Sequence, residues 1–198
     1  MTQNGLSVYD FDHTIYNGDA SADFIFYAIK QDIRLLRYVP MMSLALFVLV
    51  FRLKSRKAVK QDAFSFLKGV RNVDAMLEGF WATHENKVAD WYKKQQEAND
   101  IIISASPDFL LAPIAEKLGV GTLIATTMNS RTGVIEGENC RGEEKLRRLD
   151  AYDSSLIIDR AYSDSLSDAP LLERASHGYI VRRGTIMPFE RRSQKAES

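Results

Sequence analysis

Two aspartates that end a short apolar run are the residues of this chain best suited to chemistry. Residues 6–11 read Leu-Ser-Val-Tyr-Asp-Phe, and Asp12 follows Asp10 at alternate positions. Alternate side chains of an extended segment share a face, so both carboxylates are predicted to point at one ligand. Carboxylates at the end of a buried strand are costly unless a cation or a reaction uses them.

Polar side chains also follow apolar runs later in the chain, and a predicted helix start offers a basic one. The residues after apolar runs are Ser104, Asp164 and Asp168, and the basic residue is Lys145. Three consecutive isoleucines precede the serine, and a short apolar run precedes the two aspartates. Ligands of a parallel α/β sheet bind beyond the carboxyl ends of its strands, so we expect these side chains to meet the first two aspartates in one crevice.

The ordered set resembles the four sequence motifs of the haloacid dehalogenase superfamily. The run Asp10-Phe11-Asp12-His13-Thr14 is similar to the DxDxT signature, and a serine after an apolar strand, a lysine and an acidic pair follow in the expected order. Four motifs in order are more specific than any one of them. Within the superfamily, the chain resembles the phosphoserine-phosphatase-like subfamily IB.

This resemblance implies a phosphatase that acts through an aspartyl-phosphate. Asp10 would be the nucleophile, and Asp12 would protonate the leaving oxygen and later deprotonate a water molecule. Mg²⁺, which prefers oxygen ligands, would screen the repulsion between the substrate and the attacking carboxylate. The other implied roles are metal ligation by Asp10, Asp164 and the backbone carbonyl of Asp12, phosphate binding by Ser104, charge balance by Lys145, and support by Asp168 and Thr14.

Two of these assignments have competitors nearby. Ser106 competes with Ser104 for the phosphate, but Ser106 suits the N-cap of the following helix better. Arg147 and Arg148 compete with Lys145, and we interpret them as the solvated face of a helix. The family pattern places a lysine at the start of this helix, which favours Lys145.

Three positions near the motifs need separate expectations. Ser163 stands where the family often has glycine, and a side chain there is expected to alter the metal loop, because glycine permits close backbone approach. His13 replaces a common glycine and would point away from the two aspartates in an extended chain. Thr14 is expected to bond only the backbone of its turn.

The elements that must position these residues alternate between strand and helix. Strand-like runs begin near residues 6, 101, 122, 155 and 178, helix-starting signals lie near residues 106, 141 and 170, and residues 132–137 suggest a hairpin or flap. This alternation predicts an α/β fold with a Rossmann-like, doubly wound parallel sheet.

A long helical segment separates the first predicted strand from the second. Apolar residues recur there at helical spacing, and the last stripe predicts one long helix that ends near Asn99. A helical insertion at this point resembles the small cap of one class of the superfamily. The sequence therefore predicts a core of residues 1–15 and 100–198 and a cap of residues 16–99.

One stretch of the predicted cap is apolar and flanked by basic residues. Residues 38–51 carry no charge, and residues 30–60 contain eight basic residues and one acidic residue, a net charge of +7. The run is shorter than the roughly 20 residues that span a bilayer. It predicts either contact with an anionic membrane surface or burial in the cap, and membrane contact is favoured because so small a cap buries such a helix poorly.

Composition limits the function classes. The formal net charge is zero, which gives no reason to expect a nucleic-acid partner. Cys140 is the only cysteine, so no internal disulfide can form, as suits the reducing cytoplasm. We expect a cytoplasmic protein with peripheral contact at the inner face of the membrane.

The expected function is Mg²⁺-dependent hydrolysis of a phosphate monoester. A narrower resemblance to the bacterial phosphatidylglycerophosphatase C family, carried by residues 162–172, 40–57 and 181–184, implies a lipid headgroup phosphate such as phosphatidylglycerophosphate as substrate. The alternatives are a soluble phosphatase of phosphoserine or another small metabolite, a phosphotransferase, and a catalytically silent membrane-associated interaction module. The helical insertion and Asp12 argue against a phospho-receiver domain.

Overall fold

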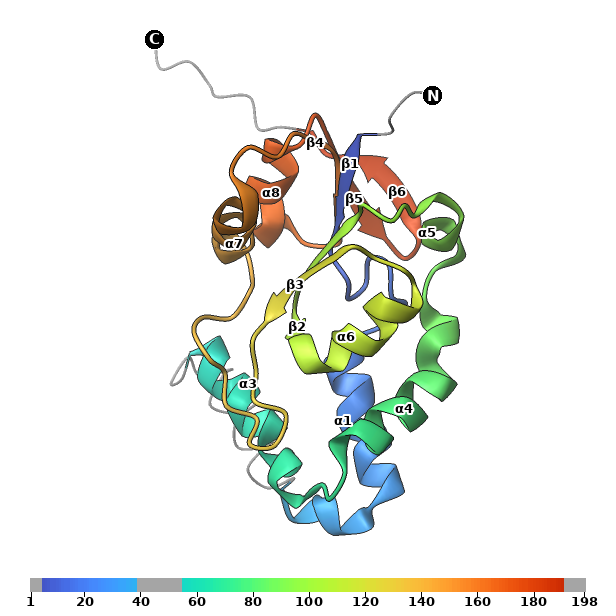
Figure 1. Ribbon diagram of the computed structural model, residues 1–198, viewed down its shortest axis with the longest axis vertical. Helices are drawn as coiled ribbons and strands as arrows, with labels where there is room; N and C mark the ends of the chain where they lie inside the picture. Colours follow the sequence, from blue (N-terminus) through green and yellow to red (C-terminus); the bar gives the residue numbers. More distant parts are fainter. Residues whose placement is uncertain (1–4, 39–54, 191–198) are drawn as a thin grey trace.

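Short apolar runs separated by helices build a six-stranded sheet in this computed structural model, which describes residues 5–38 and 55–190 (Figure 1). The predictions for residues 39–54, which include most of the uncharged stretch, lie outside the described residues. In chain order the strands are β1 (Leu6–Tyr9), β2 (Ile101–Pro107), β3 (Thr122–Thr126), β4 (Ile158–Ser163), β5 (His177–Arg182) and β6 (Thr185–Pro188).

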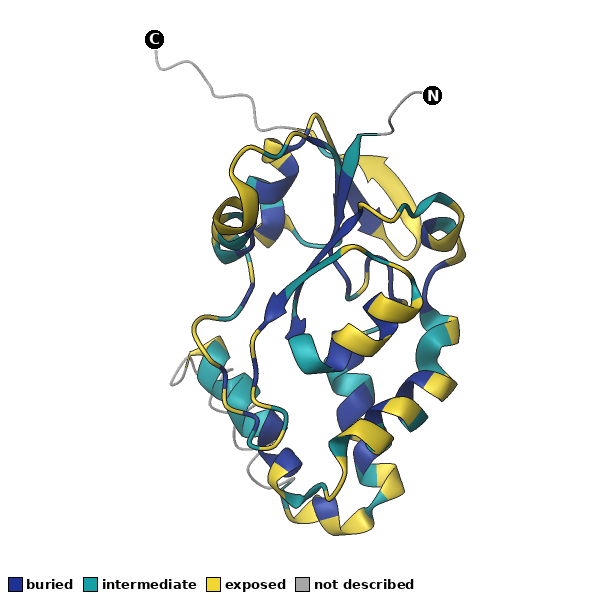
Figure 2. Ribbon diagram, in the orientation of Figure 1, coloured by how far each residue is buried: buried dark blue, intermediate teal, exposed yellow. Residues whose placement is uncertain are grey.

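The strand order is β3-β2-β1-β4-β5-β6, and every neighbouring pair from β3 to β5 is parallel. The doubly wound α/β fold predicted from the sequence is therefore confirmed. The antiparallel strand β6 was not predicted. It follows a tight turn in which Arg183 and Gly184 both have positive φ, and it is exposed along its length (Figure 2).

Side chains alternate between the two faces of the sheet and form two apolar clusters. Tyr9 and Ile102 belong to the cluster that includes α6 (Asp108–Lys117). Their neighbours Val8, Ile101 and Ile103 belong to the cluster on the other face, which α7 (Glu143–Asp153) and α8 (Ala169–Arg174) cover. Burial on both faces explains why these strands read as continuous apolar runs.

Most of the helical segment between β1 and β2 lies below the sheet in Figure 1, whereas its last helix lies beside the sheet. Its elements are α1 (Ala20–Gln31), η1 (Ile33–Tyr38), α3 (Arg56–Phe64), η2 (Ser65–Gly69), α4 (Val73–His84), η3 (Glu85–Lys87) and α5 (Asp90–Gln95). No helix within residues 5–38 and 55–190 is long and apolar enough to cross a membrane. The division of the chain into a core and a cap at the expected residues stays a prediction.

The single long helix expected up to Asn99 is wrong. Helix α4 ends at His84, and the chain then becomes extended at Val88. There the N–H of Asn17 donates to the carbonyl of Lys87 and the N–H of Ala89 donates to the carbonyl of Ile15, both at 2.8 Å. This pairing with the loop after β1 replaces the hydrogen bonds of a continuous helix.

A hairpin follows β3, as the sequence predicted. The N–H of Asn129 donates to the carbonyl of Val134 at 2.9 Å, and Gly133 takes a φ of +74° in the turn. A Cβ at Gly133 would lie 2.5 Å from the carbonyl oxygen of Phe64, so the glycine lets the hairpin pack against the end of α3.

Candidate active site

The chain leaves the sheet after Tyr9 and carries Asp10 to the carboxyl end of β1. The N–H of Asp10 still donates to the carbonyl of Tyr162 in β4, at 2.8 Å. The carbonyl of Phe11 then accepts the N–H of Tyr16 at 2.9 Å, which closes the turn toward α1. The chain places β2 and β3 on one side of β1, and then β4 and β5 on its other side. Asp10 lies at the carboxyl end of β1, next to this switch between the two sides, which is where ligands bind in open α/β sheets.

Lys145 lies between two buried carboxylates. Its ammonium nitrogen is 2.7 Å from Asp10 Oδ1 and 2.6 Å from Asp168 Oδ2, and the lysine side chain is only 2% exposed. Helix α7 begins at Glu143 and directs Lys145 inward, whereas Arg147 and Arg148 both bind Glu144. The structure thus brings Lys145, and neither arginine, to Asp10.

Asp168 is held by several donors from its surroundings. Its Oδ1 accepts the N–H of Gly142 at 3.1 Å, and its Oδ2 accepts the hydroxyl of Ser163 at 2.8 Å in addition to Lys145. The Ser163 hydroxyl also lies 3.4 Å from Asp10 Oδ2. With both oxygens occupied, Asp168 is placed to orient Lys145. Ser163 thus joins the two carboxylates, and its expected effect on the metal loop stays a prediction.

Asp12 faces the same pocket as Asp10. Its Oδ1 accepts the N–H of Ala20, the first residue of α1, at 2.7 Å, and its Oδ2 accepts the hydroxyl of Ser106 at 2.6 Å. Burial raises the pKa of Asp12 to about 6, and the negative charge of Asp19 adds to this effect. A carboxyl group that titrates near neutral pH can both give and take a proton.

Burial and ion pairing act in opposite directions on the other charged groups. Burial raises the pKa of Asp10 above its usual range, and the nearby Lys145 opposes this shift. Burial also disfavours the charged form of Lys145, but Asp10 and Asp168 together hold its pKa above the ordinary value. Lys145 is therefore a fixed positive charge beside Asp10.

The two serines at the end of β2 have different positions from those expected. Ser104 is fully buried and its Oγ accepts the N–H of Ser106 at 3.0 Å, so it does not line the pocket, and its role toward a phosphate stays a prediction. Ser106 lines the pocket. Its interpretation as a helix N-cap is wrong, because α6 begins at Asp108 and Pro107 is the cap residue.

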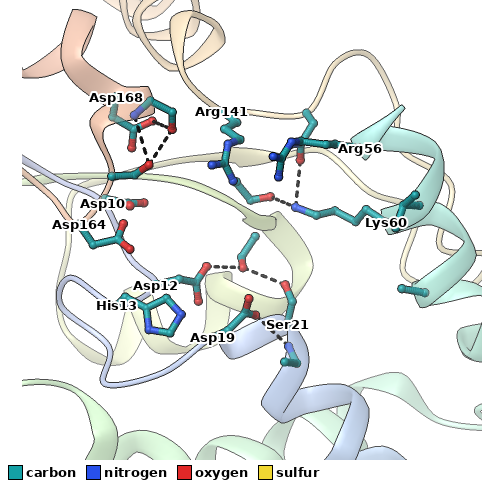
Figure 3. Close-up of a pocket in the computed structure, with 18 of the residues that line it drawn as sticks. Asp10, Asp12, His13, Asp19, Ser21, Arg56, Lys60, Arg141, Asp164 and Asp168 are labelled. Atoms are coloured by element: carbon teal, nitrogen blue, oxygen red, sulfur yellow. Dashed lines mark hydrogen bonds between the residues drawn. The ribbon is translucent and has the colours of Figure 1, made fainter. Parts of the chain in front are cut away.

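Asp164 follows β4 directly and lines the pocket beside Asp10 (Figure 3). Oxygen atoms of Asp10, Asp164 and the Asp12 backbone would make a donor set of the kind that Mg²⁺ prefers. No group of three or more acidic, histidine or cysteine side chains suited to a metal occurs within the described ranges. Two carboxylates and a carbonyl nevertheless fit Mg²⁺, because this ion usually keeps several water ligands.

Two residues of the first motif differ from expectation. His13 has a φ of +56°, so the chain is not extended there, and the histidine lines the pocket instead of pointing away from it. Thr14 is buried, and its hydroxyl has no hydrogen-bond partner among the described residues. The expected bond from Thr14 to the backbone of the turn, which lies within those residues, is therefore absent.

The pocket also contains basic residues that were not assigned to it from the sequence. Its volume is about 400 Å³, and Arg56, Lys60 and Arg141 line it together with the carboxylates (Figure 3). The sequence places Arg56 and Lys60 among the basic residues that would face a membrane surface, and this expectation is wrong for Lys60, which points into the pocket. No local pattern signals this orientation, because it depends on how α3 packs against the sheet.

Known proteins resemble this chain in sequence and in fold. Protein CicA of Caulobacter vibrioides is 29% identical over 197 residues, which cover 90% of this chain and 87% of the relative. A solved structure of a Bordetella pertussis protein of unknown function superposes with a TM-score of 0.75 at 22% identity and covers 89% of both chains. A phosphoserine phosphatase, solved as an analogue of its phospho-aspartyl intermediate, has a TM-score of 0.55 at 17% identity and covers 89% of this chain and 86% of its own.

The two solved structures share the fold of this chain, at identities too low to carry function by themselves. A family model provides the stronger link, since it matches residues 8–173 and so includes every predicted site residue from Asp10 to Asp168. The chain belongs to the haloacid dehalogenase-like hydrolases.

Proposed function

We propose that this protein is a Mg²⁺-dependent phosphomonoester hydrolase that acts through an aspartyl-phosphate intermediate. The observation that carries the proposal is Lys145, buried between Asp10 and Asp168 beside a pocket that also holds Asp12 and Asp164. Transfer of a phosphoryl group to a carboxylate requires a nucleophile, a proton donor and a nearby positive charge. Asp10, Asp12 and Lys145 can supply these three functions.

The contacts of Asp10 suggest which oxygen reacts. Its Oδ1 is engaged by Lys145 and by the N–H of Phe11, whereas Oδ2 has, among the residues that the structure describes, only the Ser163 hydroxyl at 3.4 Å. Oδ2 therefore attacks phosphorus, the bond from phosphorus to the ester oxygen breaks, and Asp12 gives its proton to that oxygen. Asp12 then takes a proton from water, which attacks phosphorus and releases phosphate and Asp10.

Asp10, Asp164 and the backbone carbonyl of Asp12 would hold Mg²⁺. When bound, the ion supplies positive charge that screens the repulsion between the phosphate and Asp10. Lys145 supplies positive charge to the same carboxylate from inside the protein, and Asp168 keeps the lysine in place. The position of Asp164, directly after β4 and half-buried in the pocket, supports this assignment.

For the substrate, we infer the phosphate of a lipid headgroup such as phosphatidylglycerophosphate. Exposed apolar side chains of α1 and η1 support this choice, since Phe26 is 72% and Ile33 67% exposed. The basic residues Lys30, Arg34 and Arg37 lie close to them in sequence. Exposed apolar residues beside basic ones are typical of contact with anionic lipid surfaces.

A soluble phosphatase of phosphoserine or a similar metabolite is the second candidate. The shared fold with a phosphoserine phosphatase favours it, and a cavity of about 400 Å³ has the volume for a small metabolite. Both candidates use the same reaction and differ only in what carries the phosphate.

The test is phosphate release with and without Mg²⁺ from phosphatidylglycerophosphate in mixed micelles, from phosphoserine and from p-nitrophenyl phosphate. We expect Asp10→Asn to lower turnover at least ~10³-fold, as for loss of a nucleophile. Asp150→Asn is the matched control, because Asp150 is exposed on α7 and does not line the pocket. Release that persists in Asp10→Asn, or no release from any of the three esters, would contradict the proposed reaction.

The choice of substrate has its own readout. Preference for the lipid supports the headgroup, and preference for phosphoserine supports the small metabolite. Phe26→Ser and Ile33→Ser should weaken binding to phosphatidylglycerol vesicles if this surface contacts lipid. Ile157→Ser is the control, because Ile157 is 82% exposed and directly precedes strand β4, outside α1 and η1. Equal binding of all three variants and wild type would contradict the membrane contact.

A further inference from the structure

Three basic side chains of the pocket have no task in the proposed reaction. Arg56 and Lys60 lie on α3, and Arg141 lies on the loop before α7, so the group comes from two distant parts of the chain. The ion pairs found within the described ranges include none of the three. Figure 3 shows them together on one side of the pocket, across from Asp10 and Asp164.

Lys60 is a mostly buried cation whose hydrogen bonds within residues 5–38 and 55–190 go to neutral groups. Its ammonium donates to the carbonyl of Ala105 at 2.6 Å and to the Asn139 side-chain oxygen at 2.9 Å. A third ammonium hydrogen is left, since the nitrogen carries three. A buried cation without a counter-ion is costly, so a negatively charged ligand would stabilise it.

The acidic residues near Lys60 are already engaged elsewhere. Asp12 and Asp19 attract the lysine through space, and the positive charge of Arg141 acts against it. Both oxygens of Asp12 accept other hydrogen bonds, and Asp19 accepts the N–H of Ala22 at the start of α1. Nothing in the described part of the chain therefore neutralises the three cations directly.

The position of this group relative to Asp12 indicates which part of a substrate it meets. Ala105, which binds Lys60, precedes Ser106, whose hydroxyl binds Asp12. Asp12 is the proposed acid for the leaving oxygen. The three cations therefore lie on the side of the pocket where the alcohol part of the ester leaves.

We propose that Arg56, Lys60 and Arg141 form a second anion subsite, so that the preferred substrates are phosphomonoesters whose alcohol part carries another anionic group. Guanidinium groups bind carboxylate and phosphate oxygens in pairs, and the ammonium of Lys60 adds a third charge. This subsite rests on the proposed hydrolase function and specifies its substrate class. The second anion is a phosphodiester if the substrate is a lipid headgroup and a carboxylate if it is a small metabolite.

The test compares esters that differ only in the second charge. Glycerol 3-phosphate and 3-phosphoglycerate are such a pair, since a carboxylate replaces one hydroxymethyl group. The deacylated headgroup, glycerophosphoglycerol phosphate, tests a phosphodiester in the same place. We expect kcat/KM to be about ten- to a hundredfold higher for at least one of the doubly anionic esters, the factor that a charge-assisted hydrogen bond supplies. The ester with the higher value identifies the source of the second anion.

The variants are Arg56→Gln and Arg141→Gln, with Arg71→Gln as the control. Arg71 is an exposed arginine of the same helical segment that does not line the pocket, so it loses the same charge. We expect both pocket variants to lower the ratio of kcat/KM for the doubly to the singly anionic ester at least tenfold, and Arg71→Gln to keep the wild-type ratio. Equal kcat/KM for all three esters, or the same ratio in all variants, would overturn the subsite.

A binding measurement separates failure of the subsite from failure of the proposed function. Calorimetry with the Asp10→Asn protein reports the affinity for 3-phosphoglycerate, glycerophosphoglycerol phosphate and glycerol 3-phosphate without turnover. If wild type hydrolyses none of the esters but Asp10→Asn binds a doubly anionic one in an arginine-dependent way, the hydrolase function fails and the subsite stands. If wild type hydrolyses all of them equally well, the subsite fails and the hydrolase function stands.

Discussion

Replacing Lys145 with methionine should destabilise the protein mainly through the carboxylates that it leaves behind. Lys145→Met keeps the apolar stem but removes the charge that lies 2.7 Å from Asp10 and 2.6 Å from Asp168. Removal of one partner from a buried ion pair costs about 3–5 kcal/mol. Both carboxylates keep other donors, Phe11 and Gly142 among them, so we expect a loss near ~3 kcal/mol in the free energy of unfolding.

The loss should depend on pH in a definite direction. Burial already raises the pKa of Asp10, and removal of Lys145 takes away the positive charge that opposes this shift, so the folded-state pKa of Asp10 lies further above that of the unfolded chain. The folded state then binds more protons than the unfolded state, so stability falls as pH rises through the folded pKa and recovers at lower pH. We therefore expect a loss of ~3 kcal/mol at pH 8 and about 1 kcal/mol at pH 5.

Urea unfolding in EDTA at both pH values measures this effect, with the midpoint and slope recorded separately. Lys117→Met is the control, because Lys117 pairs with Glu85 at the surface and exposed pairs contribute at most about 1 kcal/mol. Addition of Asp168→Asn to Lys145→Met should restore part of the loss. A loss below ~1 kcal/mol at pH 8, or an equal loss at both pH values, would refute the reasoning.

Four further predictions follow from single residues. Ser163→Ala removes the hydroxyl that joins Asp168 to Asp10 and should lower kcat more than it changes KM in steady-state kinetics, with recovery in Ser163→Thr. Burial raises the pKa of Asp100 to about 6, so the folded state binds the extra proton, and Asp100 should contribute a loss of up to about 3 kcal/mol in unfolding free energy as pH rises from 4 to 7. Asp100→Asn should remove this contribution, so its unfolding free energy should fall less over this pH range than that of wild type. Gly133→Ala should lower the melting temperature, because its Cβ would meet the carbonyl oxygen at the end of α3. Thr14→Val should leave the unfolding free energy unchanged or raise it by about 1 kcal/mol, because the buried hydroxyl that it removes has no partner.

The first motif and its lysine show what sequence order can specify. Asp10 and Asp164 follow apolar runs, and Lys145 lies in the first turn of a helix. The alternation of strands and helices brings the ends of parallel strands to one edge of the sheet. Their convergence could therefore be predicted without distances, and the structure places Lys145 against Asp10 as the order implied. The family match confirms the expectation of a hydrolase.

The elements that were missed depend on contacts between distant residues. The break between α4 and α5 exists because residues 87–89 pair with the loop after β1, and no local propensity encodes that pairing. Strand β6 is short and exposed, so it lacks the apolar run that identified the buried strands. The Ser106 side chain was assigned to a helix cap by its type, whereas its contact with Asp12 depends on how β2 lies beside β1.

The sequence by itself thus determined the fold class, the order of the motifs and the group of carboxylates with one lysine. These follow from hydrophobic periodicity and chain order, which are properties of neighbouring residues. Only the tertiary structure decided that Lys60, Arg56 and Arg141 share a pocket with those carboxylates. A basic residue looks the same in sequence whether it faces solvent or a cavity, because its direction is set by the packing of its helix against the rest of the protein.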